Sequence, residues 1–373
     1  MTAIPLIDLR AQYTSLLPEI ENRLLATVRS GRFIGGPEVE AFERAFAEFC
    51  GVAQGVACAN GTDALELLLD AWGIGPGDEV IVPAMSWIST SEVVATRGAV
   101  PVFVDIDPGS HCIDPTGVAA ALTPRTRAII AVHLYGHPAD LTALRQLADR
   151  HDLYLLEDCA QAHGARWDDQ PIATFGHAAT FSFFPSKSLG AYGDGGAVVT
   201  HDAELAGRVR ALANHGMPGV RHVHTLHGRN SRLDALQAAA LNVKLPHLRG
   251  WIEQKNRLAD RYREALQPLA RAGVLSLPNP HPRAYHGYHL FVIRTARRAA
   301  LAAYLNEQQI GNTVHYPTAL PLHGCYADAG HRPGDFPHAV ALSETALSIP
   351  LYAELSEPDQ DRVIRSLQAF FAA

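Results

Sequence analysis

The sequence lacks the features that mark membrane and secreted proteins. No run approaches the ~20 apolar residues that a membrane-spanning helix needs. The opening stretch MTAIPLIDLR has no basic segment followed by an apolar one, so no secretory signal peptide is predicted. The five cysteines are odd in number, scattered and without a CxxC pair. They favour reduced thiols in a cytoplasmic protein over a disulfide framework.

An excess of positive charge is also missing. The chain has 31 Lys and Arg against 38 Asp and Glu, a net charge of −7, which argues against binding to nucleic acid or to an acidic membrane surface. There is no internal repeat and no low-complexity tract. With 47% hydrophobic and 18% charged residues, the composition is that of an ordinary globular protein. A length of 373 residues suffices for one large and one smaller domain.

Short apolar segments alternate with helical patterns over most of the chain. An amphipathic helix is expected over residues 12–29, and strands are then expected at 55–59, 79–84, 101–106, 127–136, 153–158, 180–184 and 196–200. Near-continuous apolar strands separated by helices indicate a mainly parallel sheet covered on both faces, an α/β three-layer sandwich. We predict a large α/β domain over residues 1–248, with the N-terminal helix, and a smaller α+β domain over 249–373.

One lysine stands where a predicted strand runs into a glycine-rich turn. The stretch FSFFPSKSLGAYGDGG, residues 181–196, surrounds Lys187 with small residues and glycines, which allow close approach of backbone and a planar ligand. An amine that acts as a nucleophile needs a lowered pKa, and a buried strand end can supply the desolvation. Taken alone, a surface lysine in a polar loop is the simpler interpretation.

A tetrad of small and polar residues, Asn60-Gly61-Thr62-Asp63, precedes the helical pattern ALELLLDAW. The free N–H groups and the positive dipole end of a helix form a seat for an anion, most naturally a phosphate. Ser182 can add a further donor to this phosphate. The alternative is a plain N-cap, with Thr62 or Asp63 capping a core helix and no ligand. For this motif alone the cap is favoured.

Three further side chains lie at or just beyond predicted strand ends. Asp158 ends the apolar strand LYLLED, where open α/β sheets bind their ligands; alternatively it caps the next turn or pairs with an arginine. Gln161 follows within one turn and can bond a ligand oxygen. Trp87 follows EVIVPA and can stack on a planar ring, although a core tryptophan is the simpler interpretation.

Together these parts match the needs of one cofactor. Pyridoxal 5′-phosphate (PLP) requires a phosphate seat, a ring stacker, a carboxylate for the pyridine nitrogen and a lysine that binds its aldehyde. Each signal is weak alone, but they occur in one chain on one α/β pattern. The sequence therefore predicts a PLP site.

The same residues resemble those of a known family. The chain resembles the fold-type I aminotransferases of the DegT/DnrJ/EryC1/StrS family over nearly its whole length. The motifs that carry the resemblance are IDLRAQY, FIGGPEVEAFE, NGTDALELLL, GIGPGDEVIVPA, PVFVDIDP, VHLYGHPADL, EDCAQAHGA, FSFFPSKSLGAYGDGGAVVT, GRNSRLDALQAA, HYPTALPLH and LSIPLY.

The resemblance implies a role for each matching cofactor residue. Lys187 would form the Schiff base, Asp158 would pair with the pyridine nitrogen and Gln161 would contact the ring hydroxyl. Trp87 would stack on the ring. The phosphate would be held by Gly61, Thr62, Ser182 and, from the neighbouring subunit, Asn230.

The resemblance also implies partners and a reaction. The family works as a homodimer with active sites at the subunit interface, and the HYP segment brings His315 and Tyr316 to the substrate. Arg229, where relatives often carry an apolar or aromatic residue, lies in a loop near the expected sugar pocket and is a third substrate candidate. The implied reaction moves an amino group from L-glutamate to a nucleotide-linked keto-sugar. A dTDP-3-keto-6-deoxyhexose is favoured, because NSRLDALQAA resembles the sugar branch.

Several alternatives stay open at this point. A branch of the family with histidine in place of the lysine removes a hydroxyl group instead, so Lys187 favours transamination. Within transaminases, a C4-keto-sugar or a keto-inositol (aminocyclitol) is the second choice of substrate. A non-catalytic PLP-binding regulator would use the same fold, yet every position that the chemistry needs is filled. A metal site at His222, His224 and His227 lacks helical or Cys/His ligand spacing, so we predict no metal.

Overall fold

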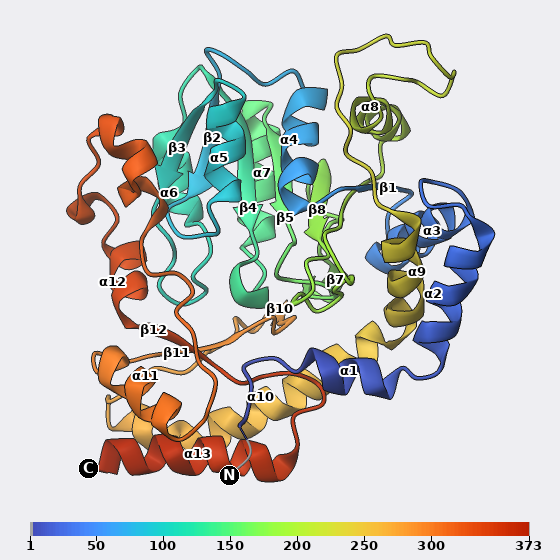
Figure 1. Cartoon of the computed structure of the whole chain (residues 1–373). Coiled ribbons are helices and arrows are strands. Elements are labelled where there is room, and N and C mark those ends of the chain that lie inside the picture. The colour runs from blue at the N-terminus through green and yellow to red at the C-terminus, as the bar shows by residue number, and fades with distance from the viewer. Residues whose placement is uncertain (1–2, 373) are drawn as a thin grey trace.

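A seven-stranded sheet forms the centre of the protein, with strand order β1-β9-β8-β5-β4-β2-β3 (Figure 1). The computed structural model of the chain describes residues 3–372. Every neighbouring pair from β8 to β3 is parallel, whereas β9 runs antiparallel to both β8 and β1. The strands are β1 (Gln54–Cys58), β2 (Glu79–Pro83), β3 (Val100–Val104), β4 (Thr126–Val132), β5 (Tyr154–Asp158), β8 (Ala178–Ser182) and β9 (Gly196–Thr200).

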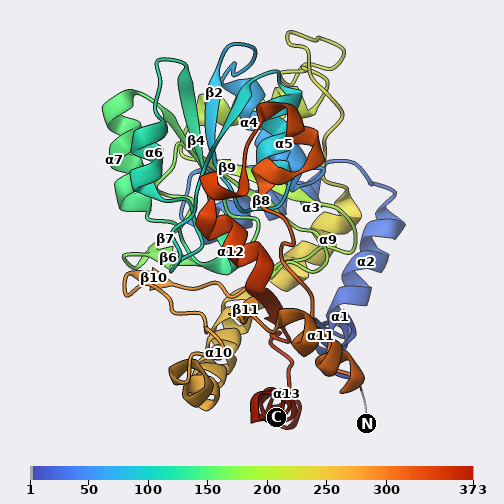
Figure 2. The same ribbon diagram turned by 90° about the vertical axis from the view of Figure 1, so that its left-hand side faces the viewer.

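Helices cover both faces of this sheet (Figure 2). Helices α4 (Gly61–Ala71), α5 (Ser89–Thr96) and α8 (Ala203–Ala213) form one layer, in which α4 contacts the other two. On the opposite face lie α6 (Pro115–Ala121) and α7 (Leu141–His151). Covered on both faces, β2 and β9 are buried at every position, which explains their apolar sequences. The predicted three-layer α/β fold is confirmed.

The N-terminal segment forms two helices, α1 (Leu9–Ser15) and α2 (Glu19–Ser30). The prediction of one helix over residues 12–29 was therefore wrong. The helix is interrupted at Pro18, which lacks the N–H of a helix interior and disfavours helical backbone in the residue before it. Helix α3 (Pro37–Cys50) begins with a proline at its first position, and both α2 and α3 pack against α9 (Ala235–Lys244).

The C-terminal part builds a second, smaller apolar core. It is centred on α10 (Leu248–Arg271), which packs against α13 (Glu357–Ala372), and on the antiparallel pair β11–β12. The remaining elements are β6 (Arg166–Trp167), β7 (Gln170–Pro171), β10 (Ala284–Tyr285), β11 (Phe291–Arg294), α11 (Arg298–Glu307), α12 (Pro337–Thr345), β12 (Ala346–Ile349) and 3-10 turns at Leu134–Gly136, Leu245–His247, Leu320–Leu322, Gly324–Ala329 and Pro333–Asp335.

Helix α10 crosses the predicted domain boundary at 248/249. Leu248 and Ile252 belong to the large core, whereas Leu258 and Tyr262 belong to the small one. The boundary itself stays a prediction. No helix within residues 3–372 combines the length and the apolar character that crossing a membrane requires.

Candidate active site

A cavity of about 580 Å³ opens at the carboxyl ends of the central strands. Its walls come from the start of α4, the segments after β2, β5 and β8, and a distant stretch around residue 315. Nine of the eleven predicted site residues line it: Gly61, Thr62, Trp87, Asp158, Gln161, Ser182, Lys187, His315 and Tyr316. Residues that were predicted from strand ends, from a helix start and from the family resemblance thus share one cavity.

Lys187 lies in the turn that follows β8. Its backbone N–H donates to the carbonyl of Phe184 (2.8 Å), which closes the turn and directs the chain back toward β9. Desolvation lowers the pKa of the Lys187 amine from its usual value to about 8, while the Asp158 carboxylate opposes that shift. The amine is thus far easier to deprotonate than a surface lysine.

Asp158 ends β5 and is paired in register with Thr180 of β8. One carboxylate oxygen accepts the N–H of Ala160 (3.1 Å) and the other accepts the hydroxyl of Thr90 (3.4 Å). Burial raises the pKa of this carboxyl group, while the Ala160 N–H and the nearby Lys187 amine lower it. Asp158 does cap the following turn, but its cationic neighbour is Lys187 and not an arginine.

The start of α4 forms a close cradle against β8. Asn60, and not Thr62 or Asp63 as expected, is the N-cap, and its side chain accepts the N–H of Asp63 (2.8 Å). A Cβ on Gly61 would lie 2.8 Å from the Cβ of Ser182, so only glycine allows this approach. Thr62 bonds the hydroxyl of Ser89 (2.7 Å). N–H groups of the first helical turn and the hydroxyls of Thr62 and Ser182 thus line the same cavity.

Two aromatic side chains and an amide line the cavity beside Asp158. Trp87 is 56% exposed and so is no core residue; its ring lies 5.8 Å from that of Tyr316. Gln161 accepts the backbone N–H of Tyr135 (2.8 Å) and donates to the hydroxyl of Tyr316 (2.9 Å). The amide is therefore held from both sides, and its orientation is fixed by these two partners.

The segment around residue 315 is held in place by two contacts that sequence reasoning missed. The Tyr135 hydroxyl donates to the backbone carbonyl of His315, and Nδ1 of His315 bonds Ser348 Oγ (2.8 Å), from β12. Burial and the nearby Lys187 amine lower the pKa of His315 to about 4, so its ring is neutral at pH 7. Tyr135 follows β4, and the strand-end rule applied to VHLYG would have found it.

Comparison with known proteins assigns this arrangement to a family. Residues 15–368 match the sequence model of the DegT/DnrJ/EryC1/StrS aminotransferase family. The chain belongs to this family. It is therefore a PLP-dependent aminotransferase of fold type I, and the predictions of family, enzyme class and cofactor are confirmed.

Similar proteins cover almost the whole chain. The erythromycin biosynthesis sensory transduction protein EryC1 of Saccharopolyspora erythraea is 47% identical over 98% of this chain and 99% of its own length. A dTDP-3-amino-3,4,6-trideoxy-alpha-D-glucose transaminase of Streptomyces venezuelae is 43% identical over 98% of this chain and 95% of its own length. A UDP-N-acetyl-3-dehydro-alpha-D-glucosamine 3-aminotransferase of Acidithiobacillus ferrooxidans is 44% identical over 97% of this chain and 96% of its own length.

Solved structures agree with these relatives. DesV of S. venezuelae, crystallised with a ketimine intermediate, superimposes with a TM-score of 0.95 at 43% identity, covering 99% of both chains. The ntda protein of Bacillus subtilis with bound cofactor PMP, the aminated form of PLP, gives 0.91 at 32% identity, covering all of this chain and 86% of its own.

The residues of this aminotransferase fit PLP chemically. The amine of Lys187 has a lowered pKa and lies in one cavity with the Asp158 carboxylate. The Gly61 cradle gathers helix N–H groups with the hydroxyls of Thr62 and Ser182, which suits a phosphate. The exposed face of Trp87 suits a planar ring.

Two predicted site residues lie outside the cavity of the aminotransferase. Arg229 forms ion pairs with Glu66 (2.6 Å) and Asp70 (3.5 Å) of α4. Asn230 is exposed and forms a β-bridge with Asn214. Neither reaches the cavity of its own chain, so their predicted roles, like those of the other site residues, stay predictions.

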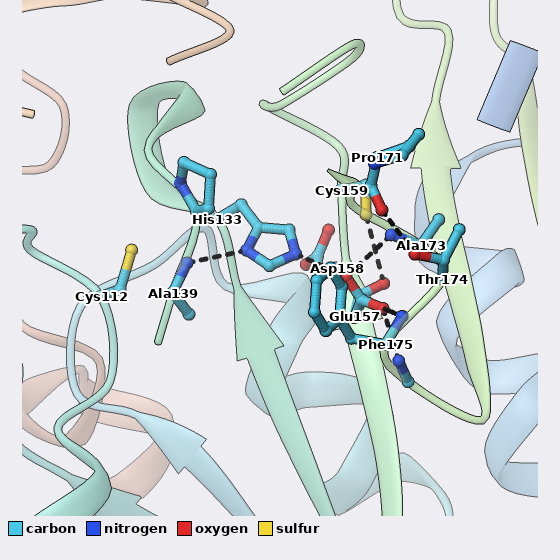
Figure 3. A network of polar contacts seen from close by, with 12 residues as sticks. Cys112, His133, Ala139, Glu157, Asp158, Cys159, Pro171, Ala173, Thr174 and Phe175 are labelled. Atoms are coloured by element: carbon cyan, nitrogen blue, oxygen red, sulfur yellow. Dashed lines mark hydrogen bonds and ion pairs between the residues drawn. The ribbon is translucent and has the colours of Figure 1, made fainter. Parts of the chain in front are cut away.

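A buried polar network lies beside Asp158 (Figure 3). His133, Glu157 and Cys159 cluster like metal ligands, but their donor atoms are engaged. Nδ1 of His133 accepts the Ala139 N–H (3.0 Å), so Nε2 carries the proton and donates to Glu157 (3.2 Å). Glu157 also accepts backbone N–H groups of residues 173, 175 and 176.

Burial raises the pKa of the Cys159 thiol well above its usual value. The cluster is a hydrogen-bonded network that braces β4 against β5.

The pKa of Lys187 predicts how the cofactor-free protein captures PLP. Only the neutral amine attacks an aldehyde, so the capture rate should rise with pH through about 8 and level off roughly one unit above. Stopped-flow absorbance between pH 6 and 11 measures this. A rate still climbing at pH 10, as for an ordinary lysine, would contradict the desolvated amine.

Proposed function

We propose that the protein transfers an amino group from L-glutamate to a nucleotide-linked keto-sugar, most specifically a dTDP-3-keto-6-deoxyhexose. One observation carries the proposal. A lysine amine of lowered pKa and a buried carboxylate lie in one cavity, beside a helix start that can seat a phosphate. That combination serves amine chemistry on PLP and has no use in a purely structural cavity.

The choice of sugar rests on the relatives. Their names describe amination at C3 of a hexose, on dTDP in one case and on UDP in another. These two are almost equally similar to this chain, at 43% and 44% identity. The position of amination is thus better supported than the nucleotide.

The chain's own residues divide the chemical work. Bound PLP supplies an aldehyde and an electron-accepting ring. Lys187 would hold the cofactor through its Nζ, and the neutral amine would act as the base for the Cα proton of the amino-acid donor. The Asp158 carboxylate would pair with the pyridine nitrogen, and Gln161 is held where its amide could face the ring hydroxyl. His315 and Tyr316 close the substrate side of the cavity.

We infer that the working enzyme is a homodimer. The cavity of one chain contains no contribution from the loop 214–229 or from Asn230, which the resemblance assigns to the neighbouring active site. Asn230 is exposed, as a residue that reaches a partner would be in one chain. The five free cysteines suit a cytoplasmic location, where thiols stay reduced.

A regulatory function is the second candidate, because EryC1 carries the name of a sensory transduction protein. The filled cavity argues for catalysis: a regulator that only binds PLP would not need both the lysine and the carboxylate. Measuring whether the protein turns over a keto substrate distinguishes an enzyme from a regulator.

The test combines colour with a substrate panel. Purified protein with PLP should be yellow, and L-glutamate should bleach it while 2-oxoglutarate forms. A 3-keto-6-deoxyhexose on dTDP should then restore the colour and yield the amino sugar, followed by mass spectrometry. The matched panel contains the same sugar on UDP, a 4-keto isomer and a keto-inositol.

Each outcome has a distinct meaning. A preference for the 4-keto sugar or the keto-inositol would replace the proposed substrate but keep the transaminase. Bleaching by glutamate without turnover of any keto substrate would favour the regulator. A colourless protein after incubation with PLP would overturn the proposal.

A further inference from the structure

The protein has three lysines in 373 residues, Lys187, Lys244 and Lys255; the other 28 of its 31 Lys and Arg residues are arginines. None of the three lysines is exposed. Lys187 faces the cavity, whereas Lys244 and Lys255 are 1% and 6% exposed. The two buried lysines lie on α9 and α10, and both point at the loop that carries Lys187.

Lys244 holds the middle of that loop. Its Nζ donates to the backbone carbonyl of Gly190 (2.7 Å) and lies 4.1 Å above the ring of Tyr192. A Cβ at Gly190 would meet the Pro185 carbonyl at 2.2 Å, so the loop folds tightly on itself at this point. Gln237, also on α9, accepts the N–H of Tyr192 (2.8 Å).

Lys255 holds the residue that follows Lys187. Its Nζ donates to the hydroxyl of Ser188 (2.7 Å). Glu354, from the C-terminal part, acts electrostatically on both Lys255 and Lys244 as their negative counter-charge. A second cavity, of about 40 Å³, is lined by Lys187, Ser188, Lys255 and Glu354. Lys187 therefore lines both this small cavity and the large one, and Lys255 lines the small cavity.

Packing alone does not explain two buried lysine amines, whose pKa values burial lowers to about 8 for Lys244 and about 7 for Lys255. Burying an unneutralised or weakly paired cation is costly, and apolar residues of similar volume usually serve a core equally well. Arginine, which the rest of the chain uses, is a planar fork with a longer reach, while an ammonium is a compact donor that approaches a carbonyl or hydroxyl at the end of a thin stem. Both buried lysines use that property on the same loop.

We propose that Lys244 and Lys255 are positioning residues for Lys187: they clamp the loop 185–192 from α9 and α10 and so fix where its amine stands in the cavity. This inference rests on the proposed role of Lys187 as the lysine that binds PLP. It assigns no contact with cofactor or substrate to either residue. Ser188 is the intermediary for Lys255, and the Gly190 carbonyl is the intermediary for Lys244.

The main experiment is a double-mutant cycle on Lys255→Met and Ser188→Ala. Cofactor-free protein is mixed with PLP, reduced with borohydride at timed intervals, and the modified peptide containing Lys187 is quantified. A displaced reactive group loses about 100-fold in rate. We expect a loss of that order for Lys255→Met, a similar loss for Ser188→Ala, and no further loss in the double variant, because both break one contact.

Stability separates positioning from a merely structural role. Lys255→Met alone leaves Glu354 without one of its cationic partners, so it is combined with Glu354→Met. Replacing both partners of a buried pair by apolar chains is neutral or stabilising, so the midpoint of thermal unfolding of the cofactor-free paired variant should equal or exceed that of the wild type while its capture of PLP stays slow. Lys244→Met, which leaves Glu354 its other cationic partner Lys255, should also slow capture. Lys255→Arg should not rescue capture, since the guanidinium does not fit the ammonium's place. The control Arg150→Met removes an exposed cation and should change neither quantity.

The outcomes distinguish this inference from the proposed function. If wild-type protein is not modified at Lys187, the proposed function fails. If the wild type is modified and Lys255→Met and Lys244→Met capture PLP at the wild-type rate, only the positioning role fails. Capture that returns to the wild-type rate in the paired Lys255→Met/Glu354→Met variant, or additive losses in the cycle, would also overturn it.

Discussion

Lys187→Ala should abolish covalent capture of PLP and reduce transamination by about 10⁴-fold or more. The variant loses both the amine that holds the aldehyde and the base that takes the donor's Cα proton, and general acid–base catalysis alone contributes up to about 10⁴-fold. Borohydride reduction followed by peptide mapping measures the first loss. The half-reaction with L-glutamate in a single turnover measures the second.

Lys187→Arg is the matched control for charge. It keeps a cation in the cavity but cannot form the covalent link, so it should fail in both assays as alanine does. Both variants should still bind PLP reversibly through the Gly61 cradle and Trp87, which equilibrium dialysis detects. Covalent modification at the remaining lysines with retained turnover would mean that another residue supplies the amine.

Asp158→Asn should reduce the rate of the glutamate half-reaction by about 100- to 5000-fold. The substitution is isosteric but removes a buried charge that stabilises a protonated ring nitrogen. Breaking a buried charge pair costs about 3–5 kcal/mol, which corresponds to that range of rates. Burial raises the pKa of Asp158, and the Ala160 N–H and the nearby Lys187 amine oppose that shift.

The same variant contains its own control for folding. Capture of PLP by Lys187 does not need a protonated ring nitrogen, so it should persist in Asp158→Asn within about tenfold of the wild type. Loss of capture together with turnover would indicate a collapsed site. Turnover within tenfold of the wild type would remove Asp158 from the catalytic machinery.

The sheet was largely readable from the sequence, because fully covered strands must be apolar along their whole length. The antiparallel direction of β9 could not be predicted from the sequence. A parallel crossover needs a connection long enough for a helix. The stretch between β8 and β9, residues 183–195, holds the lysine turn instead, and β9 returns antiparallel. The break at Pro18 was missed because the apolar spacing of residues 12–29 continues across it.

The site was readable wherever a side chain follows a strand. Lys187 and Trp87 follow strands and Asp158 ends one, and strand ends meet at one edge of a parallel sheet. The long-range supports were not readable: Tyr135 contacts His315, 180 positions away, and His315 contacts Ser348. Lys244 and Lys255 read as ordinary helix lysines until their burial is known.

None of the three lysines is exposed, so the folded protein should resist a protease that cuts after lysine. A protease that cuts only after lysine has three target bonds in the chain, and all of them flank residues held inside or facing the cavity. Cleavage must then wait for the chain to open locally at α9, α10 or the 185–192 loop. The cleavage rate, measured with and without PLP, therefore reports how often these segments open, and it needs no engineered probe.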